Sequence, residues 1–211
     1  TQNQAFSALL FFYRTLWKCD LGDVSQTVRA RRGEKLPTVL SEVEVRSLLT
    51  AMSGTPRIVA ELLYGCGLRL TEALNLRVKD VDFARCTVEV RHGKGGKDRI
   101  VMLPEWSEPR LREQLEMAKR LWESDREREI PGVAMPGALA RKMPTAGESW
   151  GWFWVFPSRK ISMDPRSGVW RRHHFHPNGM QRAISNSGRK AAIARRVTCH
   201  TLRHSFATHL L

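Results

Sequence analysis

Cysteine and tyrosine are scarce in this sequence of 211 residues, which has four cysteines and two tyrosines. No two cysteines form a Cys-x-x-Cys pair, so the sequence predicts neither a disulfide framework nor a cysteine-based zinc site. No run approaches the roughly 18 apolar residues that span a membrane, and no basic-then-apolar leader with a small-residue cleavage site is visible. We therefore expect a cytoplasmic protein with reduced thiols and no membrane partner.

Acidic residues are also few, and they are very few near the C-terminal end of the sequence. The whole chain has 35 Lys and Arg against 21 Asp and Glu, a formal net charge of +14. Residues 160–211 contain a single acid, Asp164. The basic residues of that segment are Lys160, Arg166, Arg171, Arg172, Arg182, Arg189, Lys190, Arg195, Arg196 and Arg203. Such a regional excess predicts a polyanionic partner, and nucleic acid fits better than an anionic membrane surface because no strong amphipathic anchor is present.

The apolar pattern predicts a mainly helical α+β chain with one small antiparallel sheet. Apolar residues recur at helical spacing over 5–18, and a basic segment ending at Pro37 is typical of a linker. We divide the chain into residues 1–28, a linker over 29–37, and a domain over 38–211.

Within that domain, Ser41 and Glu44 predict a capping box, and Thr71 predicts the cap of a later helix. Alternating residues around a Gly-rich turn predict a β-hairpin over 86–103. Further helices are expected from Pro56, over 108–128, over 177–194 and from Thr201, with an irregular Pro/Gly-rich stretch over 131–149.

Three short motifs contain residues suited to phosphate chemistry. Arg69 follows two glycines and precedes a predicted helix N-terminus, where free N–H groups favour an anion. Lys94 stands on the hairpin tip, from which an ammonium group can reach an oxygen leaving a phosphate. His200 and Arg203 share one helix face, which places a proton carrier beside an anion-holding group.

Each motif by itself has a simpler interpretation. Arg69 can pair with Glu72 on the surface, Lys94 can belong to an ordinary solvated turn, and the histidines can be surface residues. His200 and His204 have the i, i+4 spacing of zinc ligands, but the glutamate of H-E-x-x-H and a third ligand are absent. We therefore expect no metal and no cofactor.

Taken together and in this order, the motifs make the chain resemble the tyrosine recombinases. They are Gly-Leu-Arg69-x-x-Glu, Gly-Lys94-Gly-x-Lys-x-Arg and His200-Thr-Leu-Arg203-His-Ser-Phe-Ala-Thr-His-Leu. The resemblance covers about 36–211, and 1–28 is similar to the end of the family's helical core-binding domain. It implies that Arg69 and Arg203 hold the scissile phosphate, Lys94 protonates the leaving 5′ oxygen, and His200 assists proton transfer. A tyrosine then attacks phosphorus to give a 3′-phosphotyrosyl link.

Two further segments resemble the integron integrases, a branch of this family that integrates and excises gene cassettes in bacteria. They are Ala138–Phe156, within an expected insertion over about 131–157, and Asp164–His174. The resemblance implies folded single-stranded DNA hairpins as partners and a tetrameric synapse. Their extrahelical bases would be caught by flat side chains, an interaction that tolerates any base. The positions concerned are Trp152, Pro165, His173 and His174, with the adjacent basic residues Arg171 and Arg172. A half-buried strand over Trp150–Trp154 fits the pattern equally well.

The sequence departs from the family pattern at its end, because it stops at Leu211, before the expected second histidine and the tyrosine. Neither Tyr13 nor Tyr64 stands at the nucleophile's place. We therefore expect this chain alone to be inactive in cleavage, although the complete enzyme would be a tyrosine site-specific recombinase. The alternatives are a non-catalytic DNA-binding fragment, a Xer or phage-type recombinase, and a metal-dependent nuclease that uses the histidines.

Overall fold

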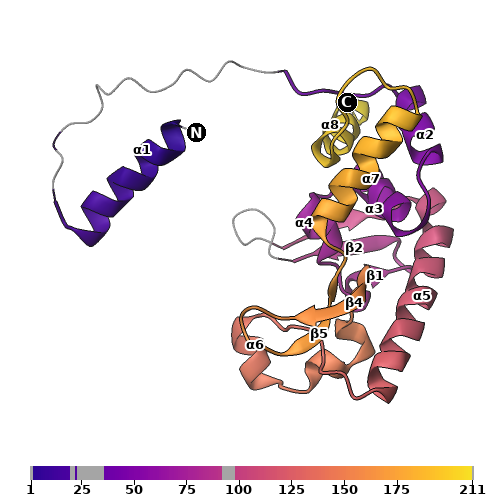
Figure 1. Ribbon diagram of the computed structural model, residues 1–211. Coiled ribbons are helices and arrows are strands. Elements are labelled where there is room, and N and C mark those ends of the chain that lie inside the picture. Colours follow the sequence, from indigo (N-terminus) through magenta and orange to yellow (C-terminus); the bar gives the residue numbers. More distant parts are fainter. Residues whose placement is uncertain (1, 20–21, 23–35, 92–97, 211) are drawn as a thin grey trace. The chain divides into compact units, whose positions relative to one another are not determined.

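The computed structural model describes all residues except 1, 20–21, 23–35, 92–97 and 211, and it divides the chain into two compact units, Thr1–Leu36 and Pro37–Leu211 (Figure 1). The first unit contains helix α1 (Gln2–Phe11) and a π-helical turn η1 (Phe12–Leu16). None of the residues of these two elements is buried, and Phe11, Leu16 and Trp17 are more than 60% exposed. This helix therefore presents an apolar surface that nothing described within its own unit covers.

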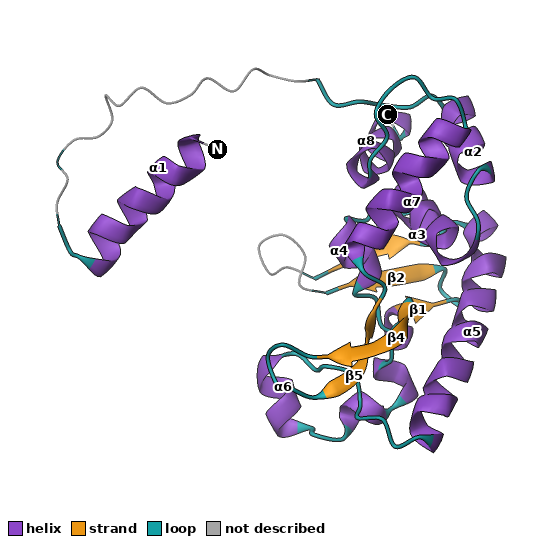
Figure 2. Ribbon diagram, viewed as in Figure 1, coloured by secondary structure: helices purple, strands orange, loops and turns teal. Residues whose placement is uncertain are grey.

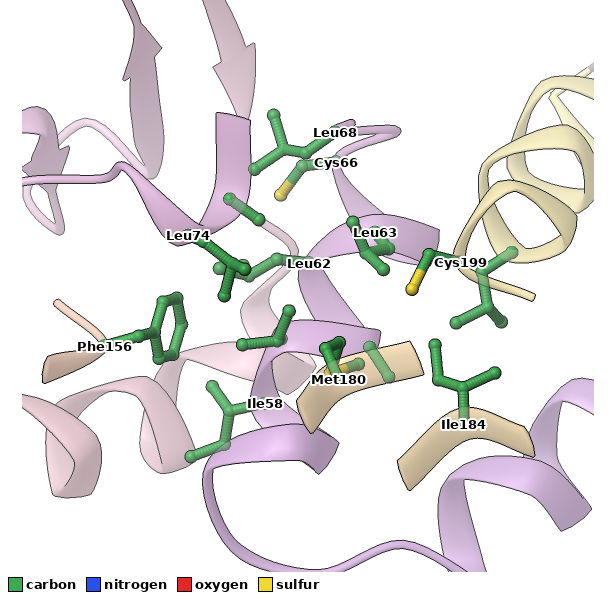
Figure 3. Packing of buried hydrophobic residues seen from close by; sticks show 14 of the residues in the cluster. Ile58, Leu62, Leu63, Cys66, Leu68, Leu74, Phe156, Met180, Ile184 and Cys199 are labelled. Atoms are coloured by element: carbon green, nitrogen blue, oxygen red, sulfur yellow. The ribbon is translucent and has the colours of Figure 1, made fainter. Parts of the chain in front are cut away.

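The core of the second unit is built around helix α3 (Gly54–Gly65), which packs against α2 (Glu42–Thr50), α4 (Leu70–Leu74), α5 (Glu108–Glu127), α7 (Pro177–Lys190) and α8 (Cys199–His209). Helix α3 is apolar on most of its circumference, and six consecutive residues from Ile58 to Leu63 are buried. Figure 3 shows Leu62 and Leu63 of α3 in one cluster of buried side chains with Met180 and Ile184 of α7 and Cys199 of α8. Elements far apart in the sequence thus share one hydrophobic core.

The predicted hairpin is confirmed, and it belongs to an antiparallel sheet with strand order β1 (Val81–Asp82), β2 (Thr87–Val90) and β3 (Arg99–Met102). Its register pairs Thr87 with Met102 and Val90 with Arg99. Figure 2 shows this sheet beside the helices, with the tip of the hairpin outside the described residues. The mainly helical α+β class is likewise confirmed.

A second, smaller core lies along the C-terminal half of α5. Ala118 of that helix packs with Val133, Phe153 and Trp154, so most of the segment over 131–157 is folded onto α5. This segment contains the short helix α6 (Gly137–Lys142) and the 3-10 turns η4 (Ala146–Glu148) and η5 (Trp150–Trp152). The prediction of a strand over Trp150–Trp154 is wrong, because Trp150–Trp152 form a 3-10 turn instead.

An antiparallel pair, β4 (Pro157–Met163) and β5 (Trp170–His174), follows this small core and was missed from the sequence (Figure 1). Strand β5 consists mostly of Arg and His, so it lacks the apolar alternation that marks a strand. Further 3-10 turns are η2 (Val78–Asp80) and η3 (Glu105–Ser107). None of the described helices is long and apolar enough to cross a membrane.

Helix starts follow capping chemistry closely. The predicted capping box is confirmed, because Ser41 Oγ accepts from the Glu44 N–H and Glu44 Oε2 accepts from the Ser41 N–H. The prediction that Thr71 caps α4 is wrong, because the N-cap is Arg69, whose N–H donates to Glu72 Oε2 at 2.8 Å. Glu72 therefore stands at the third helical position, where its carboxylate lies beside the helix N-terminus.

Candidate nucleic-acid interface

Three arginines from separate segments of the chain surround the carboxylate of Glu72. Arg69 Nη1 donates to Glu72 Oε1 at 2.8 Å. Arg99, from the first position of β3, binds both carboxylate oxygens, at 3.0 and 2.7 Å. Arg203, from α8, places its Nη1 3.9 Å from Glu72 Oε2. The pair of Arg69 with Glu72 considered from the sequence is therefore present, but the Glu72 side chain is only 6% exposed and is shared by all three arginines.

Gly67 allows α8 to approach the turn that carries Arg69. Its φ of +60° belongs to the left-handed region, which glycine enters without steric cost. A Cβ atom there would lie 2.3 Å from the Phe206 ring of α8. Arg203 donates to the Gly67 carbonyl oxygen, which joins the two segments directly. Arg69 and Arg203, far apart in the sequence, are thus brought to one carboxylate by the packing of α8 on this turn.

His200 occupies the first turn of α8, on the same side of the helix as Arg203. The helix starts at Thr198, whose hydroxyl accepts from the Thr201 N–H. The His200 side chain is exposed, and its ring centroid lies 6.4 Å from that of His204. Among the described residues, no group of three or more potential metal-binding side chains occurs. His200 is therefore placed for contact with a molecule that approaches from solvent.

Lys94 lies outside the described residues, but both arms of its hairpin are anchored within them. On the β2 side, Arg91 Nε donates to Asp80 Oδ1 at 2.9 Å. On the β3 side, Arg99 binds Glu72. Both carboxylates are nearly buried, with side chains 4% and 6% exposed. The residues on either side of the hairpin tip are therefore held by ion pairs, Arg91 to η2 and Arg99 to the helix that follows Arg69.

The charges at this site favour an added anion. Burial alone would raise the pKa of Glu72, but hydrogen bonds from Arg99 and Arg69 outweigh it and lower that pKa to about 2. The pKa of Arg203 is lowered, first by burial and then by repulsion from Arg69. Two guanidinium groups that repel each other across one carboxylate are stabilised when a phosphate comes between them.

A cleft of about 630 Å³ begins at Glu72 and extends to the small core around α5. Its walls include Arg77, Arg91, Leu139 and Trp152. One face of the Trp152 ring is covered by Lys79, whose Nζ lies 3.0 Å from the ring centroid. Trp152 is half-buried and its neighbour Trp154 is buried, so the cluster divides into a core tryptophan and a tryptophan that lines the cleft.

The remaining residues predicted to contact DNA lie on β5 and the turn before it, away from the lining of this cleft. Pro165 is exposed in that turn, and His173 is half-buried. His174 packs edge-on against Trp154, its Nδ1 lies 2.8 Å from the Phe175 carbonyl oxygen, and its pKa is lowered by burial. Arg171 is 17% exposed and lies beside Asp164 at 3.8 Å.

The prediction that Arg172 contacts DNA is wrong. Its side chain is 5% exposed and binds both oxygens of Asp125 of α5, at 2.5 and 2.6 Å. It also donates to the carbonyl oxygens of Ser158 and Arg159. Four of the five N–H donors of this nearly enclosed guanidinium are used inside the protein, so Arg172 is a structural residue that joins β5 to α5.

Comparisons with known proteins place these observations in a family. The model of the Phage integrase family matches residues 38–211, which include the described site residues Arg69, Arg99, His200 and Arg203. The chain belongs to the Phage integrase family.

An integrase/recombinase of Escherichia coli is 50% identical to this family member over 211 residues, which is 100% of the chain and 63% of that relative. The chain therefore spans less than two thirds of the relative's length. A crystal structure of XerA recombinase matches 98% of the chain with a TM-score of 0.56 and 29% identity, and the match covers 60% of that protein. The structure of XerH site-specific recombinase bound to palindromic difH substrate in a post-cleavage complex matches 83% of the chain. There the TM-score is 0.53, the identity 25%, and the match covers 42% of that protein.

Sequence reasoning underrated two residues of the site. Glu72 was considered only as a surface partner of Arg69, and Arg99 only as part of a motif. The signal was present in the pattern of the hairpin, because Arg99 starts the returning strand and therefore lies next to the hairpin tip, where its side chain can reach α4.

Proposed function

We propose that this chain is the phosphate-binding, catalytic part of a site-specific tyrosine recombinase that cuts and rejoins DNA. The observation that carries the proposal is the convergence of Arg69 and Arg203 on Glu72, next to the exposed His200. Membership of the Phage integrase family supports it. The likeness to XerH supports it as well, because that site-specific recombinase is bound to its difH substrate in a post-cleavage complex.

The proposed roles follow from charge and position. Arg69 and Arg203 bind the non-bridging oxygens of the scissile phosphate and stabilise the charge that develops on them. A tyrosine oxygen attacks phosphorus, the bond to the 5′ oxygen breaks, and Lys94 supplies that oxygen with a proton. His200 orients or relays a proton. The positive side chains supply the charge that a metal ion supplies in other phosphoryl transfers.

The first test is binding of the chain to a fluorescein-labelled DNA duplex at several salt concentrations. Arg69→Gln and Arg203→Gln should each weaken binding and lower the salt slope by about one, because one phosphate contact is lost. The matched control is Arg46→Gln, which removes the same charge from a side chain 80% exposed on α2. Equal slopes in all three variants would contradict a phosphate site at Arg69 and Arg203.

The second test concerns the reaction itself. A chimera in which this chain replaces the matching residues of the Escherichia coli integrase/recombinase should recombine that protein's DNA sites, because half of the residues are identical. Arg69→Gln within the chimera should abolish product while DNA binding remains measurable. An active chimera whose activity survives that substitution would refute the proposed role.

Within this function, we propose the integron type, acting on folded single-stranded hairpins with extrahelical bases and assembling as a tetramer. The support is the cleft beside Glu72, in which Trp152 offers an aromatic face and Arg91, with a side chain 37% exposed, offers positive charge. Stacking one unpaired base on such a ring contributes about 1–3 kcal/mol. His173, His174 and Pro165 would serve a second extruded base at β5.

The integron and Xer types are separated by comparing DNA shapes. The chain should bind a hairpin with protruding bases more tightly than the matching perfect duplex. Trp152→Ala should weaken hairpin binding by about 5- to 150-fold and leave duplex binding nearly unchanged. Trp106→Ala, which removes a tryptophan 48% exposed outside the cleft, is the control. Equal affinity of the unmodified chain for both DNAs would favour the Xer or phage type.

A further inference from the structure

Arg99 is the third arginine at Glu72, and the proposed reaction does not use it. It makes the most complete contact, because each of its two terminal nitrogens binds a different carboxylate oxygen, at 3.0 and 2.7 Å. Arg69 makes one side-chain bond and Arg203 a looser contact at 3.9 Å. Bidentate pairing fixes the plane of the carboxylate, so Arg99 determines the orientation of the Glu72 oxygens toward Arg69 and Arg203.

We infer that Arg99 is a positioning residue, which orients and neutralises Glu72 so that Arg69 and Arg203 stay available for a DNA phosphate. This inference rests on the proposed function and deepens it. Arg99 is expected to act through Glu72 and to make no phosphate contact of its own.

The charge argument starts from the carboxylate. Without Arg99, Glu72 would hold Arg69 and Arg203 tightly and repel a phosphate that approaches them. The reason is proximity, because its carboxylate oxygens lie 2.8 Å from Arg69 Nη1 and 3.9 Å from Arg203 Nη1. With Arg99 in place, three guanidinium groups and one carboxylate leave a net charge of 3 − 1 = +2 at the site. Without it, the net charge falls to +1, and the carboxylate competes directly with DNA for the two remaining arginines.

The position argument concerns the hairpin. Arg99 pairs with Val90 at the last register position before the hairpin tip, so its side chain holds the start of β3 in place. The same side chain contacts α4, where Glu72 stands three residues after Arg69. One ion pair therefore links the start of β3 to the helix that follows Arg69.

The test uses the full chain and a fluorescein-labelled DNA duplex of about 30 base pairs, a length chosen to exceed one protein footprint. The variants are Arg99→Gln, Arg99→Lys, Glu72→Gln and the double variant Arg99→Gln/Glu72→Gln. The matched control is Arg85→Gln, which removes one positive charge from a side chain 84% exposed at the other end of the sheet. Thermal unfolding is recorded for each variant.

Arg99→Gln should weaken DNA binding by about tenfold more than Arg85→Gln, the size expected for one lost charge-assisted contact. Arg99→Lys should fall between the two, because it keeps the charge and loses the bidentate pair. The double variant should bind as well as Arg85→Gln, because no carboxylate remains to be neutralised. A double variant as weak as Arg99→Gln would overturn the inference, since Arg99 would then contact DNA itself.

A second comparison keeps the inference testable if Arg99→Gln alone fails to fold. In the Glu72→Gln background, adding Arg99→Gln should cost no more affinity than Arg85→Gln does in the unmodified chain. A larger cost would refute a role through Glu72. If the unmodified chain shows no salt-dependent DNA binding, the proposed function fails; if it binds and Arg99→Gln equals Arg85→Gln, only the role of Arg99 fails.

Discussion

The buried ion pair between Arg172 and Asp125 gives the sharpest prediction about stability. Both side chains are almost fully enclosed, 5% and 2% exposed. Replacing Arg172 by Met leaves the carboxylate of Asp125 buried without its partner. It also leaves the carbonyl oxygens of Ser158 and Arg159 without the donor that reaches both of them.

The expected cost of Arg172→Met is about 3–5 kcal/mol of the free energy of unfolding, the range for removing one member of a buried pair. A domain of this size has roughly 5–15 kcal/mol in total, so the variant should be close to unfolding. The double variant Arg172→Met/Asp125→Leu removes both charges, and pairs of this kind are often replaced by apolar residues at little cost. We expect it to recover most of the loss.

The assay is urea unfolding followed by tryptophan fluorescence, which reports on this region because Trp154 Nε1 donates to the Arg172 carbonyl oxygen at 3.2 Å. The four chains of the double-mutant cycle give the coupling energy between the two side chains. DNA affinity is measured on the same samples. A loss of stability below about 1 kcal/mol, well under the buried-pair range, together with a clear loss of DNA affinity would refute the reasoning, because Arg172 would then be an exposed DNA contact.

Three further predictions concern the proposed phosphate site. Gly67→Ala should destabilise the domain by more than Gly54→Ala, measured by urea unfolding, because both have a φ of +60° but only the first would drive a Cβ into Phe206. Stability due to Glu72 should be complete above pH 4.5, its ordinary pKa, and be lost as pH falls toward its folded pKa of about 2. Between about pH 6.5 and 3.5 the unmodified chain should lose about 1 to 2 kcal/mol that Glu72→Gln should not lose. A chelator should leave DNA affinity, followed by fluorescence anisotropy, unchanged. A loss of affinity that is reversed by added zinc would contradict the metal-free proposal.

The sequence by itself determined part of the local structure and pointed to residues of the proposed phosphate site. The capping box at Ser41, the hairpin over 86–103 and the helix from residue 108 depend on residues near one another in the chain, so their patterns predict them. Arg69, His200 and Arg203 were singled out as candidates because each stands in a short motif at a helix start or on one helix face. The charge of 160–211 predicted a polyanionic partner without any knowledge of contacts, because it depends on composition alone.

Only the tertiary structure decided which charged side chains are available to a partner. Arg171 and Arg172 look alike in the sequence, yet strand alternation turns Arg172 toward Asp125, 47 positions earlier in the chain. The same holds for Trp152 and Trp154. Trp152 ends a 3-10 turn and lines the cleft, whereas Trp154 is buried in the small core with Ala118 of α5. Arg99 meets Glu72 only because the hairpin returns beside α4. Burial and partnership depend on groups distant in the sequence, so packing determines whether a charge binds inside the protein or outside it.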